Sequence, residues 1–442
     1  MLKLYTIIKP LTKFTVWFTI LVQVGLQLPG NEVYIVRNYN EIFDKAINDK
    51  KYYDNTDLRF NKQYDFMLSR QELDEYLSFK DSLVSDYKND LKLKTFNSKS
   101  IYYCLSRELK TKIEDYFDLI NADLIEYDNL IFKRASDELL ISQIASEIEG
   151  NLKIEGVNTT RRQIMQIIKT KDTKTENSKI ILNMYNGILF IADKPEFNKE
   201  NLKKLYEILS NGCLKESDIL GEKYYRDDIV YIGDHIGCNV NLIEESMNSL
   251  FDFINSKSQS QYIELLKPFI AHYYILYIHP YFDYNGRTAR MVESWLFNNK
   301  EYKYAPRFVS EAINDYKTKY YEYIDKSRNS HNDLTYFLTF LLSLANKYYI
   351  AYKNVDYVKE KIEATGEQIS TNLLHYYKKI LISNFDWFNW KVFHEFCNLD
   401  ITKQATFKIL NQMCDYGILI TKNNSSGEKI YKLNDKLIKY NL

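Results

Sequence analysis

Hydrophobic residues are most concentrated in residues 263–278 (IELLKPFIAHYYILYI), where apolar side chains occupy nearly every face of a helical repeat. This pattern predicts a helix that is buried nearly all round. Pro268 either kinks that helix or marks its first turn. Pro280 ends it, because proline has no amide proton and biases the residue before it away from the helical region. His279 is therefore expected on a loop directly after a rigid helix.

The pattern becomes helical again after Asn285 and Gly286. Apolar residues return at spacings that form an inward face, at Met291, Trp295 and Leu296. Arg287 and Arg290 are three positions apart, so both lie on one side of the first turn. A loop with free amides that leads into a helix N-terminus favours anions, because the unpaired N–H groups and the helix dipole both attract negative charge. The two arginines predict a ligand with several phosphates.

Asp283 lies in the loop between these two helical patterns. Its carboxylate offers the hard oxygen ligands that Mg²⁺ takes together with substrate phosphates. Residues 279–290 therefore predict a site for a metal nucleotide. Each residue alone also fits an ordinary turn with solvated arginines, but the set between a buried and an amphipathic helix favours a site.

This segment resembles the active-site motif of Fic proteins, His-Pro-Phe-x-Asp-Gly-Asn-Gly-Arg-x-x-Arg. The matching positions are His279, Pro280, Asp283, Asn285, Gly286, Arg287 and Arg290. Tyr281 replaces the family's phenylalanine, and Tyr284 stands where most members have glycine. Glycine lets the backbone approach the phosphates at little steric cost. Tyr284 is therefore expected to narrow the site, strain the backbone or change the accepted nucleotide, although the related Doc toxins accept alanine there.

The resemblance implies a protein adenylyltransferase that transfers AMP from ATP, with Mg²⁺, to a tyrosine, threonine or serine hydroxyl of a protein, with self-modification as one outcome. It implies that His279 is the general base and that Asp283 holds Mg²⁺. It assigns nucleotide binding to Asn285, Gly286, Arg287 and Arg290. Two other classes stay open: a nucleotide-sensing DNA-binding regulator whose site is weakened by Tyr284, and a toxin-like transferase of a phosphoryl or another nucleotidyl group.

A second resemblance lies upstream. In many Fic proteins a Ser/Thr-x-x-x-Glu-Gly motif places its glutamate against the second motif arginine and excludes the nucleotide γ-phosphate. Glu155 fits this role through the Gly156 and the Thr-Thr-Arg that follow, although Asn151 stands where the motif has Ser or Thr. Glu149 begins a rival Glu-Gly copy. The downstream context favours Glu155, and a surface glutamate beside a turn is the alternative.

Helical patterns recur along the chain, so the predicted fold is mostly α. They cover residues 69–80, 105–119, 139–154, the segment capped by Thr159 and Thr160, 202–211, 242–253, 316–327 and 334–349. Residues 224–233 predict a short hairpin that turns at Asp227 and Asp228. The resemblance makes it a flap in which Tyr231 and Ile232 position the target by strand addition, while a plain structural hairpin is the alternative. The Fic-type helical bundle is expected over residues 136–349.

Residues 370–382, residues 387–396 and a segment capped by Thr402 predict three helices, followed by two short strands. This order is typical of a winged helix-turn-helix domain. On DNA it would offer Lys403, Gln404, Lys408, Lys422 and Lys429. Docking of a protein or of a second copy as a homodimer is an equal alternative. The expected division is an N-terminal helical region over 1–130, a Fic domain with its inhibitory segment over 131–352, and a winged-helix domain over 353–442.

Charge adds little to this picture, because Lys+Arg and Asp+Glu balance at 59 each over 442 residues, which argues against a global field for nucleic acid or membranes. Five scattered cysteines without CxxC spacing fit a reducing, cytoplasmic setting and predict no zinc site. Residues 14–28 are apolar but short for a membrane span, so a buried helix or strand pair is expected and membrane association stays open. Residues 88–99 are expected to form a solvated loop or helix face.

Overall fold

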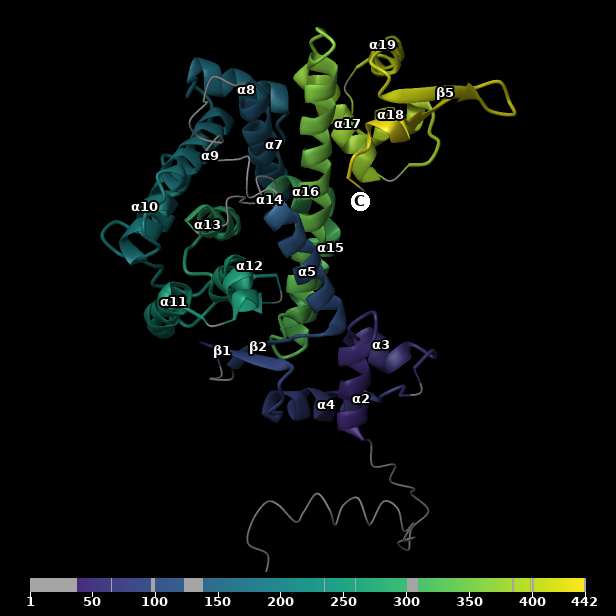
Figure 1. Cartoon of the computed structure of the whole chain (residues 1–442). Helices are drawn as coiled ribbons and strands as arrows, with labels where there is room; N and C mark the ends of the chain where they lie inside the picture. The colour runs from purple at the N-terminus through teal and green to yellow at the C-terminus, as the bar shows by residue number, and fades with distance from the viewer. Residues whose placement is uncertain are drawn as a thin grey trace, which may run out of the picture.

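The computed structural model describes residues 38–440, except for residues 65, 97–99, 123–137, 234, 259, 300–308, 384, 398 and 400. The predicted fold class is confirmed, because most of the described chain is helical and its strands form short two-stranded hairpins (Figure 1). The expectation for residues 14–28 lies outside the described residues. Within the described ranges, no helix is long and apolar enough to cross a membrane.

The N-terminal helices form a small cluster at one end of the molecule (Figure 1). They are α2 (Tyr39–Asn48), α3 (Asn55–Phe60) and α4 (Arg70–Ser82). Ser69 caps α4 through a capping box, as its sequence predicts. Lys80 of this cluster forms a buried ion pair with Asp333, with 2.6 Å between Nζ and Oδ2, so the cluster is anchored to the rest of the chain.

The next segment corrects the expectation for residues 88–99. β1 (Lys88–Lys94) pairs antiparallel with β2 (Ser100–Cys104). Leu91 and Leu93 are both buried while Lys92 between them is exposed, so one face of the strand enters the core. The period-two alternation of this short segment therefore decides its structure, and the lysine content does not.

A helical bundle occupies the centre of the molecule (Figure 1). Its helices are α5 (Arg107–Ala122), α7 (Glu138–Ile154), α8 (Arg161–Thr170), α9 (Glu176–Ala192), α10 (Lys199–Ser210), α11 (Val240–Asn255), α12 (Gln261–Ile278), α13 (Asn285–Asn299), α14 (Val309–Asp315), α15 (Lys317–Asn329) and α16 (Thr335–Glu363), with the short η1 (Glu216–Asp218) between α10 and α11. The prediction that α12 is buried nearly all round is confirmed. Pro268 lies inside this helix and not in its first turn.

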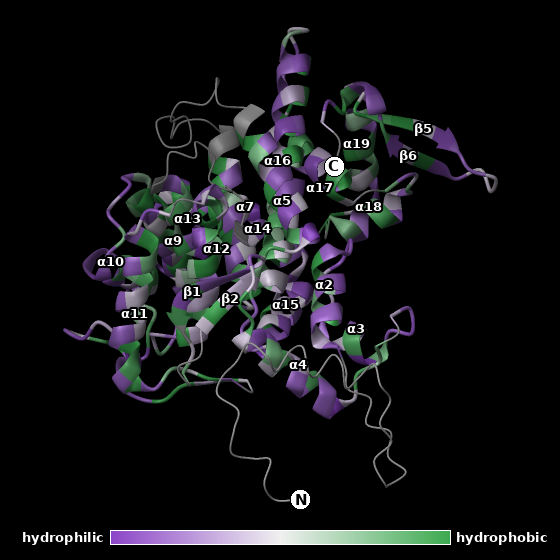
Figure 2. Cartoon of the chain, turned by 60° about the horizontal axis from the view of Figure 1, so that its bottom comes forward, coloured by the Kyte–Doolittle hydropathy of each residue, from purple (hydrophilic) through white to green (hydrophobic). Residues whose placement is uncertain are grey.

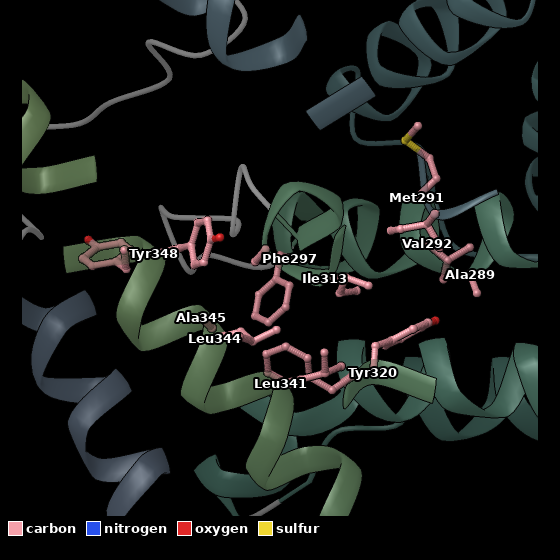
Figure 3. Close-up of a cluster of buried hydrophobic side chains, with 14 of the residues drawn as sticks. Ala289, Met291, Val292, Phe297, Ile313, Tyr320, Leu341, Leu344, Ala345 and Tyr348 are labelled. Atoms are coloured by element: carbon pink, nitrogen blue, oxygen red, sulfur yellow. The ribbon is translucent and has the colours of Figure 1, made fainter. Parts of the chain in front are cut away.

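The packing of α13 against its neighbours fixes the segment that follows His279. Ala289, Met291, Val292 and Phe297 of α13 belong to a cluster of buried side chains with Leu341, Leu344 and Tyr348 of α16 (Figure 3). The indole Nε1 of Trp295 donates a hydrogen bond to the carbonyl of Pro195 (2.9 Å). Both helices on either side of the motif loop are therefore held by the core.

The hairpin predicted within residues 224–233 is displaced along the chain. β3 (Tyr231–Ile232) pairs with β4 (His235–Ile236), so the predicted turn at Asp227 and Asp228 is wrong. Arg226 explains the difference, because its amide donates to the carbonyl of Pro280 (2.9 Å) and its Nε donates to the carbonyl of His279 (2.7 Å). These contacts hold the preceding residues against the loop after α12, and the chain turns after Ile232.

The C-terminal part packs beside α16 (Figure 1), and its hairpin projects from the body of the molecule (Figure 2). Its elements are α17 (Thr371–Ser383), α18 (Trp390–Phe396), α19 (Lys403–Asp415), β5 (Leu419–Asn423), β6 (Lys429–Leu433) and η2 (Asp435–Leu437). Thr402 caps α19, as predicted. The predicted order of three helices and a hairpin is confirmed, while the winged-helix assignment and its DNA or protein partner stay predictions. The boundary expected between 352 and 353 falls inside the continuous α16.

Candidate active site

His279 is the C-cap of α12, where Pro280 prevents the helix from continuing. Its backbone is left-handed (φ 55°, ψ 62°), a conformation that costs a non-glycine residue roughly 1–2 kcal/mol. Burial lowers the pKa of the imidazole to about 4, so His279 is neutral at pH 7. Its Nδ1 faces the carbonyl of Leu276 at 3.4 Å, and since a carbonyl only accepts, this contact assigns the proton to Nδ1 and leaves Nε2 as the acceptor.

The hairpin of β3 and β4 lies directly beside His279. The amide of Cys238 donates to the carbonyl of Ile278 (3.0 Å), and a Cβ at Gly237 would lie 3.4 Å from the Cβ of His279. Tyr231 is 74% exposed on this hairpin. Ile232, the other predicted flap residue, pairs with His235 across the two strands. A two-stranded hairpin has an unpaired edge on each strand, which is what strand addition by a peptide needs.

Asn285 shapes the loop between α12 and α13. Its side-chain Nδ2 donates to the carbonyl of Tyr281 (2.8 Å), and its Oδ1 accepts from the amide of Tyr281 (3.0 Å). The ring of Tyr281 in turn stacks on Tyr206, with 3.8 Å between ring centroids. The side chain of Asn285, which was predicted to bind nucleotide, therefore holds the loop backbone. In this way it fixes where the neighbouring amides lie.

Tyr284 fulfils the expectation of a strained backbone, with φ 64°. Its buried ring supports Arg287, whose guanidinium carbon lies 3.4 Å from the ring centroid, in a cation–π stack. Asp283 lies on the outer side, where its Oδ1 accepts from the amide of Tyr284 (2.6 Å) and lies 3.7 Å from Nη2 of Arg287. The side chain of Asp283 is 57% exposed. A tyrosine at this position therefore covers one face of a motif arginine.

Glu155 contacts Arg290, with 2.5 Å between Oε1 and Nη2. Burial alone would raise the pKa of Glu155, but the charge and hydrogen bond of Arg290 hold that pKa below its usual value. The carboxylate also lies over Gly286, where an added Cβ would be only 2.6 Å from Oε1. Asn151, the mismatch to the Ser/Thr position, accepts from the same Nη2 (2.9 Å) and donates to Ser310 Oγ (3.2 Å). Glu155 and Asn151 therefore both contact Arg290, the second arginine of the motif.

The rival Glu-Gly copy, Glu149-Gly150, lies inside α7 and has other contacts. Glu149 pairs with Lys153 on its own helix, with 2.7 Å between Oε1 and Nζ. Gly150 is a packing position, since an added Cβ would lie 2.5 Å from the carbonyl of Ser310 at the start of α14. Of the two copies, Glu155 is the one that contacts Arg290 in the structure.

Comparison with known proteins identifies one domain of the chain. The model of the Fic/DOC family matches residues 196–297, which include the hairpin, α12, the loop and most of α13. The chain carries a Fic domain. Curated relatives named "Protein adenylyltransferase Fic" include those of Nematostella vectensis, 26% identical over 56% of this chain and 56% of that protein, and of Aedes aegypti, 25% identical over 48% and 42%.

A solved Fic family protein from Desulfovibrio desulfuricans aligns with 75% of this chain and 97% of that chain, at 17% identity and a TM-score of 0.47. The chain spans about half the length of the curated relatives that it matches.

Near Arg290, a network of buried polar side chains joins α12, α13 and α15 of the Fic domain. His272 of α12 contacts Glu293 of α13, with 2.5 Å between Nδ1 and Oε2, and its Nε2 lies 2.9 Å from the hydroxyl of Tyr320. Burial raises the pKa of Glu293 and lowers the pKa of His272, so burial disfavours the charged form of each partner. Sequence reasoning missed this network. The signal was a polar residue on each helix, His272 within an apolar run and Glu293 one turn after Arg290.

The residues of the motif fit a phosphate ligand. Nε of Arg287 and Nε of Arg290 are both buried and have no hydrogen-bond partner within the described part of the chain. Buried donors without partners are costly, and phosphate oxygens would satisfy them. Across the described residues no group of three or more His, Cys, Asp or Glu side chains could hold a metal ion. Asp283 as a lone, exposed carboxylate fits Mg²⁺ that takes its remaining ligands from nucleotide phosphates and water.

Proposed function

We propose that this chain is a protein adenylyltransferase that transfers AMP from ATP to a hydroxyl of a protein and is restrained by Glu155. The contact of Glu155 with Arg290 over Gly286 carries the proposal, because it places a carboxylate where a phosphate would otherwise meet the motif arginine. The matched Fic/DOC family model and the curated relatives named protein adenylyltransferase Fic support the choice of AMP.

His279 supplies the general base. Its neutral Nε2 accepts the proton of the target hydroxyl while that oxygen bonds to the α-phosphorus and the bond to the β-phosphate breaks, which releases pyrophosphate. The open hairpin edge beside His279 holds the target segment extended, with Tyr231 and Ile232 as its contact residues. Because binding through main-chain hydrogen bonds fixes position but little sequence, several protein targets, including a second copy of the chain, are compatible.

The loop and the first turn of α13 stabilise the phosphates. Asn285 fixes the loop, so that its amides and the N-terminus of α13 form the anion site, with Gly286 leaving space for the phosphates. Arg287 and Arg290 contact the outer phosphates. Asp283 would hold Mg²⁺, which would neutralise phosphate charge when bound. The positions of these groups are set by the two core helices before substrate arrives, so catalysis is chiefly positioning and charge stabilisation.

The test is incubation of the full chain with isotopically labelled ATP, GTP, CTP and UTP, alone and with a lysate, followed by mass spectrometry of modified peptides. We expect an AMP adduct on a hydroxyl residue. The toxin-like alternative predicts a phosphoryl or another nucleotidyl adduct instead. The regulator alternative, favoured by the ring of Tyr284 over Arg287, predicts no adduct with any nucleotide and retention of promoter DNA by the chain.

Tyr284 is expected to orient Arg287 for the phosphates. In a Glu155→Gly background, Tyr284→Gly should weaken ATP binding about three- to tenfold, because a desolvated cation–π stack contributes on the order of 1 kcal/mol. Tyr284→Phe is the matched control, since it keeps the ring under the guanidinium, and its ATP affinity should stay within about twofold. Tighter binding by Tyr284→Gly in calorimetry would show that the ring obstructs the phosphates and would reverse this assignment.

A further inference from the structure

A cavity lies between α7, α8, α16 and α17, and no motif residue lines it. Its empty volume is about 260 Å³, which includes solvent at its mouth. Hydroxyl groups and cationic side chains from different helices meet in it: Ser142 and Ser146 of α7, Arg161 of α8, and Thr371, His375 and Lys378 of α17. This lining offers hydrogen-bond donors from several directions.

Several cationic side chains surround the cavity. Burial lowers the pKa of His375, and the nearby cations Arg161, Lys378, Lys379 and Lys153 lower that pKa further, so this histidine is neutral. The three lysines each contact a carboxylate: Lys378 with Glu311 at 2.7 Å, Lys379 with Asp315 at 2.5 Å, and Lys153 with Glu149 at 2.7 Å. Each of these lysines therefore has a carboxylate partner, which leaves Arg161 as the cation of the lining that no carboxylate of the described residues contacts.

Arg161 makes no ion pair with an acidic side chain in the described chain. Its Nη2 donates to Oδ1 of Asn372, and its Nη1 is buried without a hydrogen-bond partner among the described residues. Desolvation lowers the pKa of this arginine, yet it stays charged. A buried, charged donor without an acceptor is unfavourable, and an anion in the cavity would complete its hydrogen bonding.

Two helix N-termini add to this field. α8 begins at Arg161 and α17 begins at Thr371, and both of these residues line the cavity. The partial positive charge of a helix N-terminus favours an anion. A tetrahedral oxyanion presents acceptors in several directions, which suits hydroxyl and guanidinium donors spread over α7, α8 and α17. We infer that this cavity binds a small phosphate-type anion, either as free phosphate or as the phosphate of a mononucleotide.

The position of the cavity suggests how such an anion acts on the proposed function, on which this step rests. Glu155 lies in the turn between the end of α7 at Ile154 and the start of α8 at Arg161. An anion that bridges Ser146 and Arg161 ties both helices to α17 and so stabilises the Glu155 contact with Arg290. Bound phosphate is therefore expected to slow AMP transfer.

Calorimetric titration of the full chain with inorganic phosphate tests the site without relying on activity. We expect Arg161→Gln to weaken phosphate binding at least tenfold. Arg162→Gln is the matched control, because Arg162 is the exposed neighbour with the same charge, and it should bind phosphate like the parent chain. Arg290→Gln should also retain this binding. Equal affinity in Arg161→Gln, or loss confined to Arg290→Gln, would overturn the cavity assignment.

Two further measurements complete the test. If Arg161→Gln does not fold, Thr371→Val removes a hydroxyl donor from the cavity, and its phosphate affinity should fall while its melting temperature without phosphate changes little. AMP titrated into Arg290→Gln, with and without Arg161→Gln, distinguishes a mononucleotide from free phosphate. Failure to find any AMP transfer would contradict the proposed function and leave the binding result standing, whereas transfer without Arg161-dependent phosphate binding would contradict the cavity site alone.

Discussion

Replacement of His279 by alanine is expected to lower the rate of AMP transfer roughly 10²- to 10⁴-fold while ATP affinity stays within about twofold. The imidazole lies at the end of α12, and in the proposed mechanism it accepts the proton of the target hydroxyl. Among the contacts of the described residues, none joins it to Arg287 or Arg290. Initial rates by mass spectrometry and ATP affinity by calorimetry, both in a Glu155→Gly background, measure the two quantities separately. His394→Ala, a histidine of α18 that contacts Thr406, is the control and should transfer AMP at the parent rate.

The pH dependence of AMP transfer should also identify His279 as the base. Burial lowers the pKa of His279 to about 4, so the base form persists well below the ordinary histidine value of 6.5. The rate should therefore be flat through pH 6.5 and fall only as pH approaches about 4. The unfolded chain takes up this proton at a higher pH than the folded chain, so the free energy of unfolding declines as the pH falls from 6.5 to 4. Circular dichroism must therefore show that the chain is still folded at each pH. Undiminished transfer by His279→Ala, or an acid limb near 6.5, would contradict this assignment.

Local signals allowed much of the fold to be predicted. The apolar run of α12, its end at Pro280 and the caps Thr160 and Thr402 depend on residues close in sequence, and the structure confirms them. The hairpin turn was placed wrongly because it depends on Arg226, whose partners His279 and Pro280 are far away in the chain. The Asp-Asp pair alone carries no information about such long-range contacts, so it could not predict where the chain turns.

The distinction between local signals and long-range contacts also holds for the active site. The spacing of His279, Asp283 and the two arginines is encoded in one short segment, so the sequence could predict it. Asn151 looked like a departure from the inhibitory motif, and the structure shows that its amide oxygen accepts from Arg290 across the helix interface. The stack of Tyr284 on Arg287 depends on rotamers and on the left-handed backbone of Tyr284. Tertiary contacts of this kind follow from packing, which spacing along the chain does not specify.

Replacement of Glu155 by glycine is expected to tighten ATP binding roughly 10- to 100-fold and to raise automodification. The change frees the Arg290 guanidinium, whose Nη2 now contacts Glu155 at 2.5 Å, for a charge-assisted bond to the γ-phosphate. It also empties the space over Gly286 that Oε1 occupies. ADP has no γ-phosphate to fill this space, so its affinity should rise much less than that of ATP.

Two companion variants separate charge from shape. Glu155→Gln keeps the volume of the side chain and removes its charge, so it should give a smaller gain in ATP affinity than glycine if both charge pairing and occupied space restrain the enzyme. Glu149→Gln is the control from the preceding helix α7, since Glu149 pairs with Lys153, and it should bind ATP like the parent chain. ATP and ADP affinities of the parent and the three variants, measured by calorimetry, decide between the outcomes. A gain confined to the Glu149 variant would transfer the inhibitory role to that residue, and a gain in none of them would remove autoinhibition from the mechanism, because the Glu155–Arg290 pair would then compete with no phosphate.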